Sequence, residues 1–472
     1  MNTDTPCNVG KPGRAMLVLR VATIVLGAVL ISLAFSDDAR IAGGPGFGLT
    51  ELLLLATGII NVLAGLLGGA IMAGWLLCQI SVGATLLIAE FALRATVGPR
   101  YTSPFQLHDR YLYDLVPGAR REYRHLPING GSQRYNVNSL GFRGDEFTVE
   151  RTTVPRVVIY GDSFIHAEYT SLEHTLARQL AGQLTRSLGQ PVEVINAGVA
   201  GYGPDQVLRR VQDELDWLQP DLLIVAVFTG NDYGDLLRNK LYRLGANSKL
   251  TENEFVFSED IKLNAALEKS APVLRNMGQE VKTALQQSMQ GGPPPRTDPA
   301  QQTIDSMDQH LREYREYIVE GDNVVRDLRT DPYSADIALQ PDSPSARYKL
   351  KLMDAVIAAI KKQAQQQDVP LLLVAVPHPM DVMGGNHASG VVDMEQFPDY
   401  RPTRMTGSLQ DIAERHGVDH INLLQPFQAA ADPAALYLLG GDDHWNNAGQ
   451  ALAAKIIAGQ INSAGYLQAI PD

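Results

Sequence analysis

Cysteine is almost absent from this chain, which has two cysteines, Cys7 and Cys78, among 472 residues. Two cysteines exclude a framework of several disulfide bridges, and no Cys-x-x-Cys or Cys/His spacing predicts a thiolate metal site. His166, His378 and His387 fall near the ends of predicted strands, but we expect them to be surface or supporting residues rather than metal ligands. The sequence therefore predicts no metal and no cofactor.

The chain also lacks an excess of positive charge. It carries 40 lysines and arginines against 52 aspartates and glutamates, a formal net charge of −12, and it has no run of basic residues. A protein that binds nucleic acid needs a basic face for the phosphates, so nucleic acid is not an expected partner. The net charge does not select among neutral, cationic and anionic small substrates.

Long apolar runs are confined to the first hundred residues. The run Met16–Phe35 is long enough to cross a bilayer as a helix, and Lys11 and Arg14 before it favour a cytoplasmic N-terminus. A cleaved signal peptide is the competing interpretation. The length of the run and the apolar segments that follow it argue against a signal peptide.

The apolar stretch from 49 to 93 is too long for one span. We predict two spans, 49–68 and 71–93, because glycines break the middle at Gly65, Gly68, Gly69 and Gly74. Glu90 and Arg94 are four residues apart and are expected to pair near the interface. A soluble hydrophobic hairpin is the alternative.

Three spans make the chain a multi-pass protein of the inner or plasma membrane. With the N-terminus inside, the C-terminal domain is expected on the periplasmic or extracellular side. The predicted parts are an N-terminal tail at 1–14, a membrane region at 15–95, a lead-in at 96–153 and an enzyme-like domain at 154–463.

A strand–helix alternation begins near residue 156. Short apolar runs predict strands at Val157–Tyr160, Val192–Ile195, Leu222–Phe228, Leu371–Val376 and His420–Leu424. Helical periodicity follows at Leu172–Leu188, Gly203–Leu218, Lys349–Gln366, Ser408–His416 and Asn447–Ile461. This pattern indicates a parallel sheet covered on both faces, and five strands fit a flavodoxin-like, doubly wound α/β fold.

Residues 235–345 interrupt this alternation. The stretch is polar, contains Gly291–Pro295, and predicts helical pieces near 260–290 and 303–328. We interpret it as an insertion over the active-site end that serves as a lid, as a surface for envelope protein partners, or as a partly disordered segment. In the lead-in, Asn138–Gly144 predicts a turn into the next element.

Four short motifs each follow a predicted strand. They are Gly161-Asp162-Ser163, Asn196-Ala197-Gly198, Gly230-Asn231-Asp232 and Asp442-Asp443-His444. In open α/β sheets, ligands bind beyond the carboxyl ends of the strands. We therefore expect Ser163, Gly198, Asn231 and His444 to converge on one edge of the sheet.

These residue types predict nucleophilic catalysis by a serine. A hydroxyl attacks well only when a base removes its proton, and His444 is the candidate base for Ser163. Asp442 is expected to hold the tautomer of His444 and to stabilise its charged form. The backbone N–H groups of Ser163 and Gly198, with the side-chain amide of Asn231, are the predicted oxyanion donors.

With these motifs the chain resembles the SGNH, or GDSL-like, hydrolase superfamily. The resemblance covers about 154–240 and 346–463 and implies the SGNH hydrolase fold and serine ester chemistry. The four marker residues of the superfamily correspond to Ser163, Gly198, Asn231 and His444.

The chain departs from the commonest pattern of the superfamily at the acid. Many members place an aspartate three residues before the histidine, where this chain has Gly441. Asp442, at minus two, has a spacing similar to that of the alginate acetyltransferase-like branch, and Asp443 is the second candidate. Asn138–Gly144 resembles the lead-in of membrane-linked members associated with surface polysaccharides.

Each motif also has a purely structural alternative. These alternatives are helix capping by Ser163, a turn at Gly198, an Asx turn at Asn231-Asp232, and capping of the last helix by Asp442 or Asp443 in competition with Asn446 or Asn447.

The function this predicts is a membrane-anchored serine esterase. It is expected to cleave O-acyl esters, chiefly acetyl, on an envelope or extracellular glycan through an acyl-enzyme on Ser163. The alternatives are a glycan O-acyltransferase with the same site, a lipid esterase, and an inactive glycan-binding scaffold.

Overall fold

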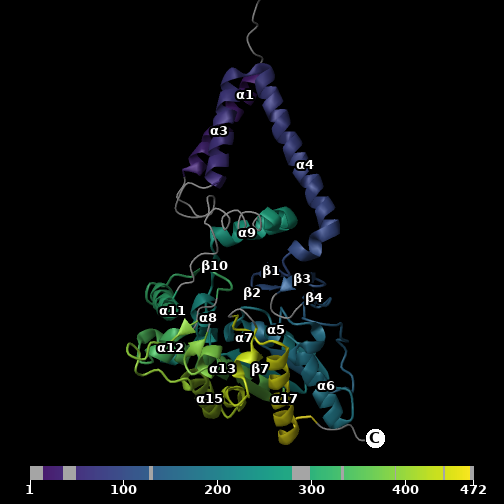
Figure 1. The fold of residues 1–472 in the computed structure, drawn as a ribbon, viewed down its shortest axis with the longest axis vertical. Helices are drawn as coiled ribbons and strands as arrows, with labels where there is room; N and C mark the ends of the chain where they lie inside the picture. Colours follow the sequence, from purple (N-terminus) through teal and green to yellow (C-terminus); the bar gives the residue numbers. More distant parts are fainter. Residues whose placement is uncertain are drawn as a thin grey trace, which may run out of the picture. The chain divides into compact units, whose positions relative to one another are not determined.

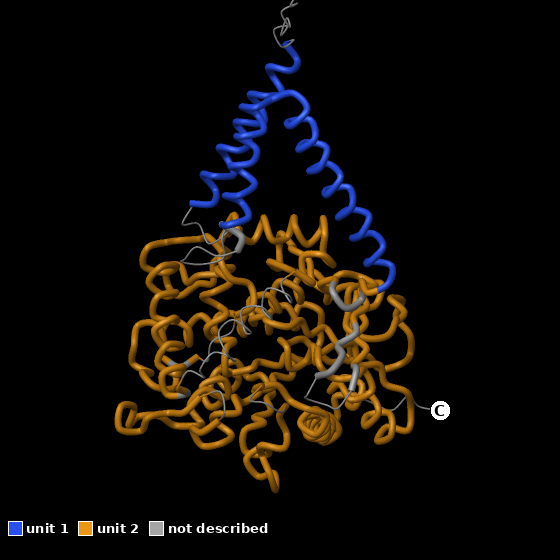
Figure 2. The backbone as a smooth tube through the Cα atoms, turned by 45° about the horizontal axis from the view of Figure 1, so that its top comes forward, with its two compact units in different colours: residues 1–96 blue, residues 97–472 orange. Residues whose placement is uncertain are grey.

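The computed structural model describes residues 14–35, 49–126, 131–278, 298–330, 334–387, 390–438 and 442–467. The chain divides into two compact units, residues 1–96 and 97–472 (Figure 2).

The N-terminal unit is helical. Helices α1 (Arg14–Ala34) and α3 (Leu49–Leu67) pack against each other, and α4 (Gly69–Tyr101) follows α3. Gly68 and Gly69 make the tight turn before α4, with φ of +66° and +56°, values that favour glycine. Gly65 and Gly74 lie inside α3 and α4, so our expectation that they also break the helix is wrong.

Glycines bring α1 and α3 close together. A β-carbon on Gly27 would lie 2.7 Å from the carbonyl oxygen of Gly58, and one on Gly58 would lie 2.8 Å from that of Gly27. Small residues of this kind allow the backbones of apolar helices to approach.

Two helices in the described part of the chain are long and apolar enough to cross a membrane. They are Arg14–Ala34 and Gly69–Gly98, whereas the apolar stretch Leu52–Leu67 between them is shorter. Signal sequences and buried core helices can meet the same criteria. The predicted pair of Glu90 and Arg94 is confirmed, with 2.7 Å between Oε1 and Nε.

The C-terminal unit contains a five-stranded parallel sheet. Its spatial order is β15 (Asp419–Asn422), β12 (Leu371–Val376), β7 (Leu222–Phe228), β5 (Arg156–Tyr160) and β6 (Glu193–Asn196). Read from the β6 edge, with the strands numbered along the chain, this order is 2-1-3-4-5, so the predicted flavodoxin-like arrangement is confirmed. The third and fourth strands have the predicted bounds, and the other three differ by one or two residues.

Helices cover both faces of the sheet (Figure 1). Apolar side chains alternate along each strand: Ile159 and Ile224 pack in one core, Val158 and Val225 in the other. The first core holds α6 (Leu176–Leu188) and α17 (Asn447–Ala464), and the second holds α7 (Pro204–Leu218), α13 (Pro344–Gln366) and α15 (Arg404–His416). Strands buried on both faces explain the continuous apolar runs in the sequence.

The lead-in and the insertion add smaller elements. The lead-in forms two hairpins, β1 (Phe105–His108) with β2 (Leu112–Leu115), and β3 (Arg120–Leu126) with β4 (Gly131–Asn136). The Asn138–Gly144 turn is present, because Asn138 Oδ1 accepts the N–H groups of Leu140 and Phe142 at 3.0 and 2.9 Å.

Helix α8 (Asp232–Arg238) overlaps the start of the predicted insertion at 235–345, and the insertion contains α9 (Glu259–Ser270) and α11 (Pro299–Tyr314). The helix predicted over 303–328 is wrong at its end: a π-helical turn closes it at Val319, and Val324–Val325 forms a strand beside Val256–Phe257. Residues 279–290 of the other predicted helical piece lie outside the described residues.

Candidate active site

Ser163 is the first residue of α5 (Ser163–His166), a single turn that follows β5. Asp162 caps this helix, since its Oδ1 accepts the N–H of Phe164 at 3.0 Å. The alternative that Ser163 is the cap is therefore wrong, and its partly exposed hydroxyl makes a different contact.

That contact is with His444. Ser163 Oγ lies 2.7 Å from His444 Nε2, and His444 Nδ1 lies 2.7 Å from Asp442 Oδ1. The same Asp442 oxygen accepts the backbone N–H of His444 at 2.9 Å. If His444 Nδ1–H donates to Asp442, then Nε2 accepts from the serine hydroxyl, which is the arrangement of a nucleophile, a base and an orienting acid.

The charges in this arrangement support each other. Burial lowers the pKa of His444, but the hydrogen bond and charge of Asp442 outweigh it, and the pKa is raised above 6.5. Burial raises the pKa of Asp442, but the hydrogen bond and charge of His444 bring it below its ordinary value. Nearby, burial raises the pKa of Asp162 to about 6, and Asp162 Oδ2 lies 3.4 Å from Ser163 Oγ.

Asn231 lies at the start of α8 and is 3% exposed. Its side chain makes no capping bond, and its buried Oδ1 has no hydrogen-bond partner within the described chain. A buried amide oxygen without a partner is unusual. Oδ1 is an acceptor, so the predicted oxyanion donor is the other end of this amide, Nδ2, which makes no capping bond. Its neighbour Asp232 is structural, as expected, because Oδ2 accepts the N–H of Phe228 at 2.9 Å.

Gly198 differs from its predicted role as an open donor. Its backbone N–H donates to Asn196 Oδ1 at 3.0 Å, while Asn196 Nδ2 donates to the carbonyl of Ile165 at 2.7 Å. A β-carbon on Gly198 would lie 2.5 Å from the backbone nitrogen of His166. Gly198 therefore allows close packing against α5, and its N–H is already bonded within the chain.

Aromatic side chains that the sequence did not single out support the site. The ring of Phe164 lies 4.3 Å from that of Phe228, 4.9 Å from that of Trp445 and 5.3 Å from that of His444, centroid to centroid. Gln450 on α17 donates to the carbonyl of Phe164 at 3.0 Å. These contacts join α5, β7 and the His444 segment.

The other predicted alternatives are resolved by the same geometry. Asn446 caps α17, accepting the N–H groups of Ala448 and Gly449 at 2.8 and 3.2 Å, so Asp442 and Asp443 do not. His166 is fully buried and its Nε2 lies 2.6 Å from the hydroxyl of Tyr135. Across the described ranges, no cluster of three or more His, Cys, Asp or Glu residues is arranged to hold a metal ion.

Ser163 and His444 line a cleft of about 1100 Å³. The lead-in contributes Phe105 and Tyr113 to its wall, and the insertion contributes residues of α9 and of 326–330. Tyr169 also lines it, with its ring centroid 6.4 Å from that of His444, and burial raises the pKa of this tyrosine to about 12.

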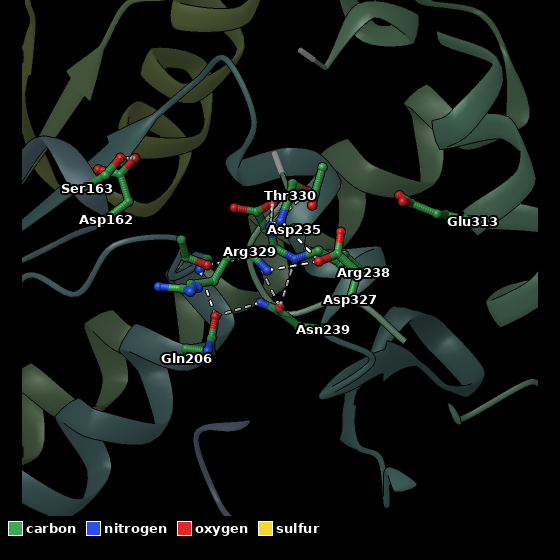
Figure 3. A network of polar contacts seen from close by, with 12 residues as sticks. Asp162, Ser163, Gln206, Asp235, Arg238, Asn239, Glu313, Asp327, Arg329 and Thr330 are labelled. Atoms are coloured by element: carbon green, nitrogen blue, oxygen red, sulfur yellow. Dashed lines mark hydrogen bonds and ion pairs between the residues drawn. The ribbon is translucent and has the colours of Figure 1, made fainter. Parts of the chain in front are cut away.

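Arg329 lines the same cleft, with its guanidinium 4.4 Å from the centroid of the Phe105 ring. Buried Arg238 holds this part of the insertion: it donates to the carbonyls of Thr330 and Gly201 at 3.3 and 2.6 Å and pairs with Asp235 at 3.1 Å (Figure 3). The insertion is therefore an integral part of the cleft wall.

The chain was compared with known protein families, curated sequences and solved structures. Residues 334–472 match the family model of the SGNH hydrolase-like domain of the acetyltransferase AlgX. No curated protein sequence matches the chain.

Similar solved structures include a lipase/acylhydrolase from Enterococcus faecalis, at 12% identity and TM-score 0.33, over 68% of this chain and 100% of that one. A catalytic mutant of Axe2, an acetylxylan esterase from Geobacillus stearothermophilus, has 11% identity and TM-score 0.34, over 67% and 97%. A two-domain esterase active on acetylated mannans has 12% identity and TM-score 0.32, over 68% and 51%.

The match of residues 334–472 to this family model confirms the resemblance to the SGNH hydrolase superfamily. The C-terminal unit has an SGNH hydrolase fold built on five parallel strands.

Proposed function

We propose that this chain is a serine enzyme that removes O-acyl groups, chiefly acetyl, from an envelope or extracellular glycan. The observation that carries the proposal is the chain of two 2.7 Å contacts from Ser163 Oγ to His444 and from His444 to Asp442. This arrangement activates a hydroxyl for attack on an ester carbonyl.

In the acylation step, Ser163 Oγ bonds to the carbonyl carbon of the ester while His444 Nε2 takes the serine proton. The oxyanion accepts hydrogen bonds from the side-chain amide of Asn231 and the backbone N–H of Ser163, which has no partner inside α5 because it is the first helical residue. The bond to the sugar oxygen then breaks, and His444 returns the proton to that oxygen. Water attacks the acyl-serine by the reverse sequence and releases the carboxylic acid.

Transfer to a sugar hydroxyl in place of water is the second candidate function. The match of residues 334–472 to an acetyltransferase domain favours it. The two functions share the acyl-enzyme and differ only in the acceptor of the second step.

The wall of the cleft supports a polar, ring-shaped substrate such as a sugar. It combines aromatic residues, including Phe105, Tyr113 and Tyr169, with charged groups, including Glu168 and Arg329. Aromatic rings present an apolar face to a ligand, and charged side chains bond its polar groups.

We also propose that α1, α3 and α4 anchor the chain in a membrane. α3 has 19 residues, which at 1.5 Å per residue approaches the thickness of the hydrocarbon core. Three spans with a cytoplasmic N-terminus put the cleft on the periplasmic or extracellular side.

The test is hydrolysis of p-nitrophenyl acetate and of acetylated xylan by the full chain in detergent, beside its Ser163→Ala variant. We expect turnover to fall at least about a thousandfold in the variant while thermal unfolding is unchanged. Equal activity in both proteins would refute the proposal. Adding an unacetylated glycan separates the two functions, because a transferase acetylates it and an esterase releases acetate.

A further inference from the structure

The second aspartate of the Asp442-Asp443-His444 motif is held by two histidines from another part of the chain. Asp443 Oδ2 lies 3.1 Å from His378 Nε2, and Asp443 Oδ1 lies 3.0 Å from His387 Nδ1. Asp443 is part of neither contact in the Ser163–His444–Asp442 chain, although it sits between two of its members.

His378 is fixed in place from several sides. It caps α14 (Pro379–Val382), where its Nδ1 accepts the N–H of Met380 at 3.0 Å, so its Nε2 carries the proton and donates to Asp443. His378 is 4% exposed. Its ring stacks on that of Phe228, with centroids 5.7 Å apart and an angle of 21° between the ring planes. A β-carbon on Gly230 would lie 2.6 Å from His378 Cδ2, so the ring also packs against the turn that carries Asn231.

His387 holds the other carboxylate oxygen from β13 (Asn386–His387). On the opposite side of the motif, Leu438 N–H donates to the carbonyl of His444 at 2.9 Å. Phe228, which stacks on His378, also packs on Phe164 beside the nucleophile, with centroids 4.3 Å apart. The contacts of Asp443 therefore link the base to the two segments that carry Ser163 and Asn231.

Resting on the proposed function, we infer that Asp443, clamped by His378 and His387, is a positioning residue that sets His444 and Asp442 in register with Ser163. Asp443 lies between Asp442 and His444 in the chain. Fixing the carboxylate of Asp443 therefore fixes the backbone from which the side chains of Asp442 and His444 extend. A shift of about 1 Å in such a site can cost a hundredfold in rate.

The experiment measures the rate at which an alkyl fluorophosphonate labels Ser163 in the full chain in detergent. In this reaction the Ser163 oxygen bonds to phosphorus, fluoride leaves, and His444 takes the serine proton, so the rate reports nucleophile and base without any acceptor. The negative groups that act on His444 are Asp442, Asp162 and Asp443. Removing one of them alters its titration, so variants are compared at the alkaline plateau, where His444 is neutral in all of them.

Asp443→Ala removes both contacts, and we expect its plateau rate to fall about ten- to hundredfold with a folded protein. Asn has the shape of Asp, and its amide offers one acceptor and one donor to the two histidines. We therefore expect the plateau rate of Asp443→Asn to lie within about threefold of the wild-type rate. His378→Asn keeps the α14 cap but is too short to reach Asp443, so it should reproduce part of the loss and add little to Asp443→Ala.

Asp354→Ala is the matched control, because Asp354 also contacts a histidine, His416 Nε2 at 3.2 Å, outside the residues that line the cleft. It should leave the plateau unchanged. If the wild type is labelled at Ser163 and Asp443→Ala is labelled at the same plateau rate, this inference is overturned and the proposed function stands. A wild type that is not labelled at Ser163 would overturn the proposed function and this inference with it.

Discussion

The backbone N–H of Gly198 donates to Asn196 Oδ1 at 3.0 Å. Gly198 corresponds to a marker residue expected to stabilise an oxyanion, yet its donor is bonded within the chain. Because Asn196 is also tied to the carbonyl of Ile165, at 2.7 Å, the bond belongs to a local structure that supports α5. The amide of Asn231 and the N–H of Ser163 are then the donors left for the oxyanion.

A Gly198→Ala substitution should destabilise the fold. The added β-carbon meets the backbone nitrogen of His166 at 2.5 Å, and overpacking of this kind costs about 1–3 kcal/mol. Thermal unfolding of the full chain measures this directly. Unchanged unfolding together with lost turnover would instead assign Gly198 a role in catalysis.

An Asn231→Ala substitution should lower turnover and leave the stability of the fold nearly unchanged. The amide oxygen has no partner within the described residues, so little native bonding is lost, whereas loss of an oxyanion donor typically lowers turnover about a hundred- to thousandfold. Turnover and unfolding temperature are measured on the same preparation. Turnover within about threefold of wild type would exclude Asn231 from the oxyanion hole.

The pH dependence of kcat/KM follows from His444. The imidazole acts as a base only when it is neutral. Burial lowers the pKa of His444, but the hydrogen bond and the charge of Asp442 outweigh burial and raise this pKa above 6.5. Activity should therefore rise with pH through a midpoint above 6.5. In Asp442→Asn the midpoint should move to lower pH and the plateau should fall about 10⁴-fold. A midpoint that does not move in the variant would contradict this assignment.

Membrane topology can be read with a single introduced cysteine, since the chain has only two of its own. Glu150 is exposed, and Glu150→Cys in a Cys7→Ser, Cys78→Ser background offers one accessible thiol. With three spans, a membrane-impermeant maleimide should label it in intact spheroplasts. Labelling only after the cells are lysed would place the cleft on the cytoplasmic side and argue for two spans.

Strand positions were predictable from sequence because the sheet is buried on both faces. A run such as Leu222–Phe228 has no polar residue to serve another purpose, and its bounds match the predicted strand. The end of the helix near Val319 was not predictable, because it depends on a pairing of Val324–Val325 with residues nearly seventy positions earlier. Local periodicity carries no information on such a contact.

The candidate site also combines features that local sequence predicts with features that depend on distant residues. The sequence ranked Asp442 before Asp443 because the spacing of Asp442 is similar to that of the alginate acetyltransferase-like branch and an aspartate directly before the histidine usually points elsewhere. It did not show which groups would hold Asp443 away from His444. These groups lie far along the chain: His378 and His387 hold the Asp443 carboxylate, which leaves Asp442 to the base. Likewise, the Gly198 position was predicted, but its bond to Asn196 arises from the way the two residues fold over α5.

The most direct test of the account is to trap the acyl-enzyme. The full chain in detergent is mixed with p-nitrophenyl acetate, quenched in acid within the first turnovers, digested and analysed by mass spectrometry. The account predicts one acetyl group on the peptide that contains Ser163 and none on that peptide in Ser163→Ala. Acetylation elsewhere at equal levels in both proteins, or no adduct on that peptide while ester is turned over, would contradict it.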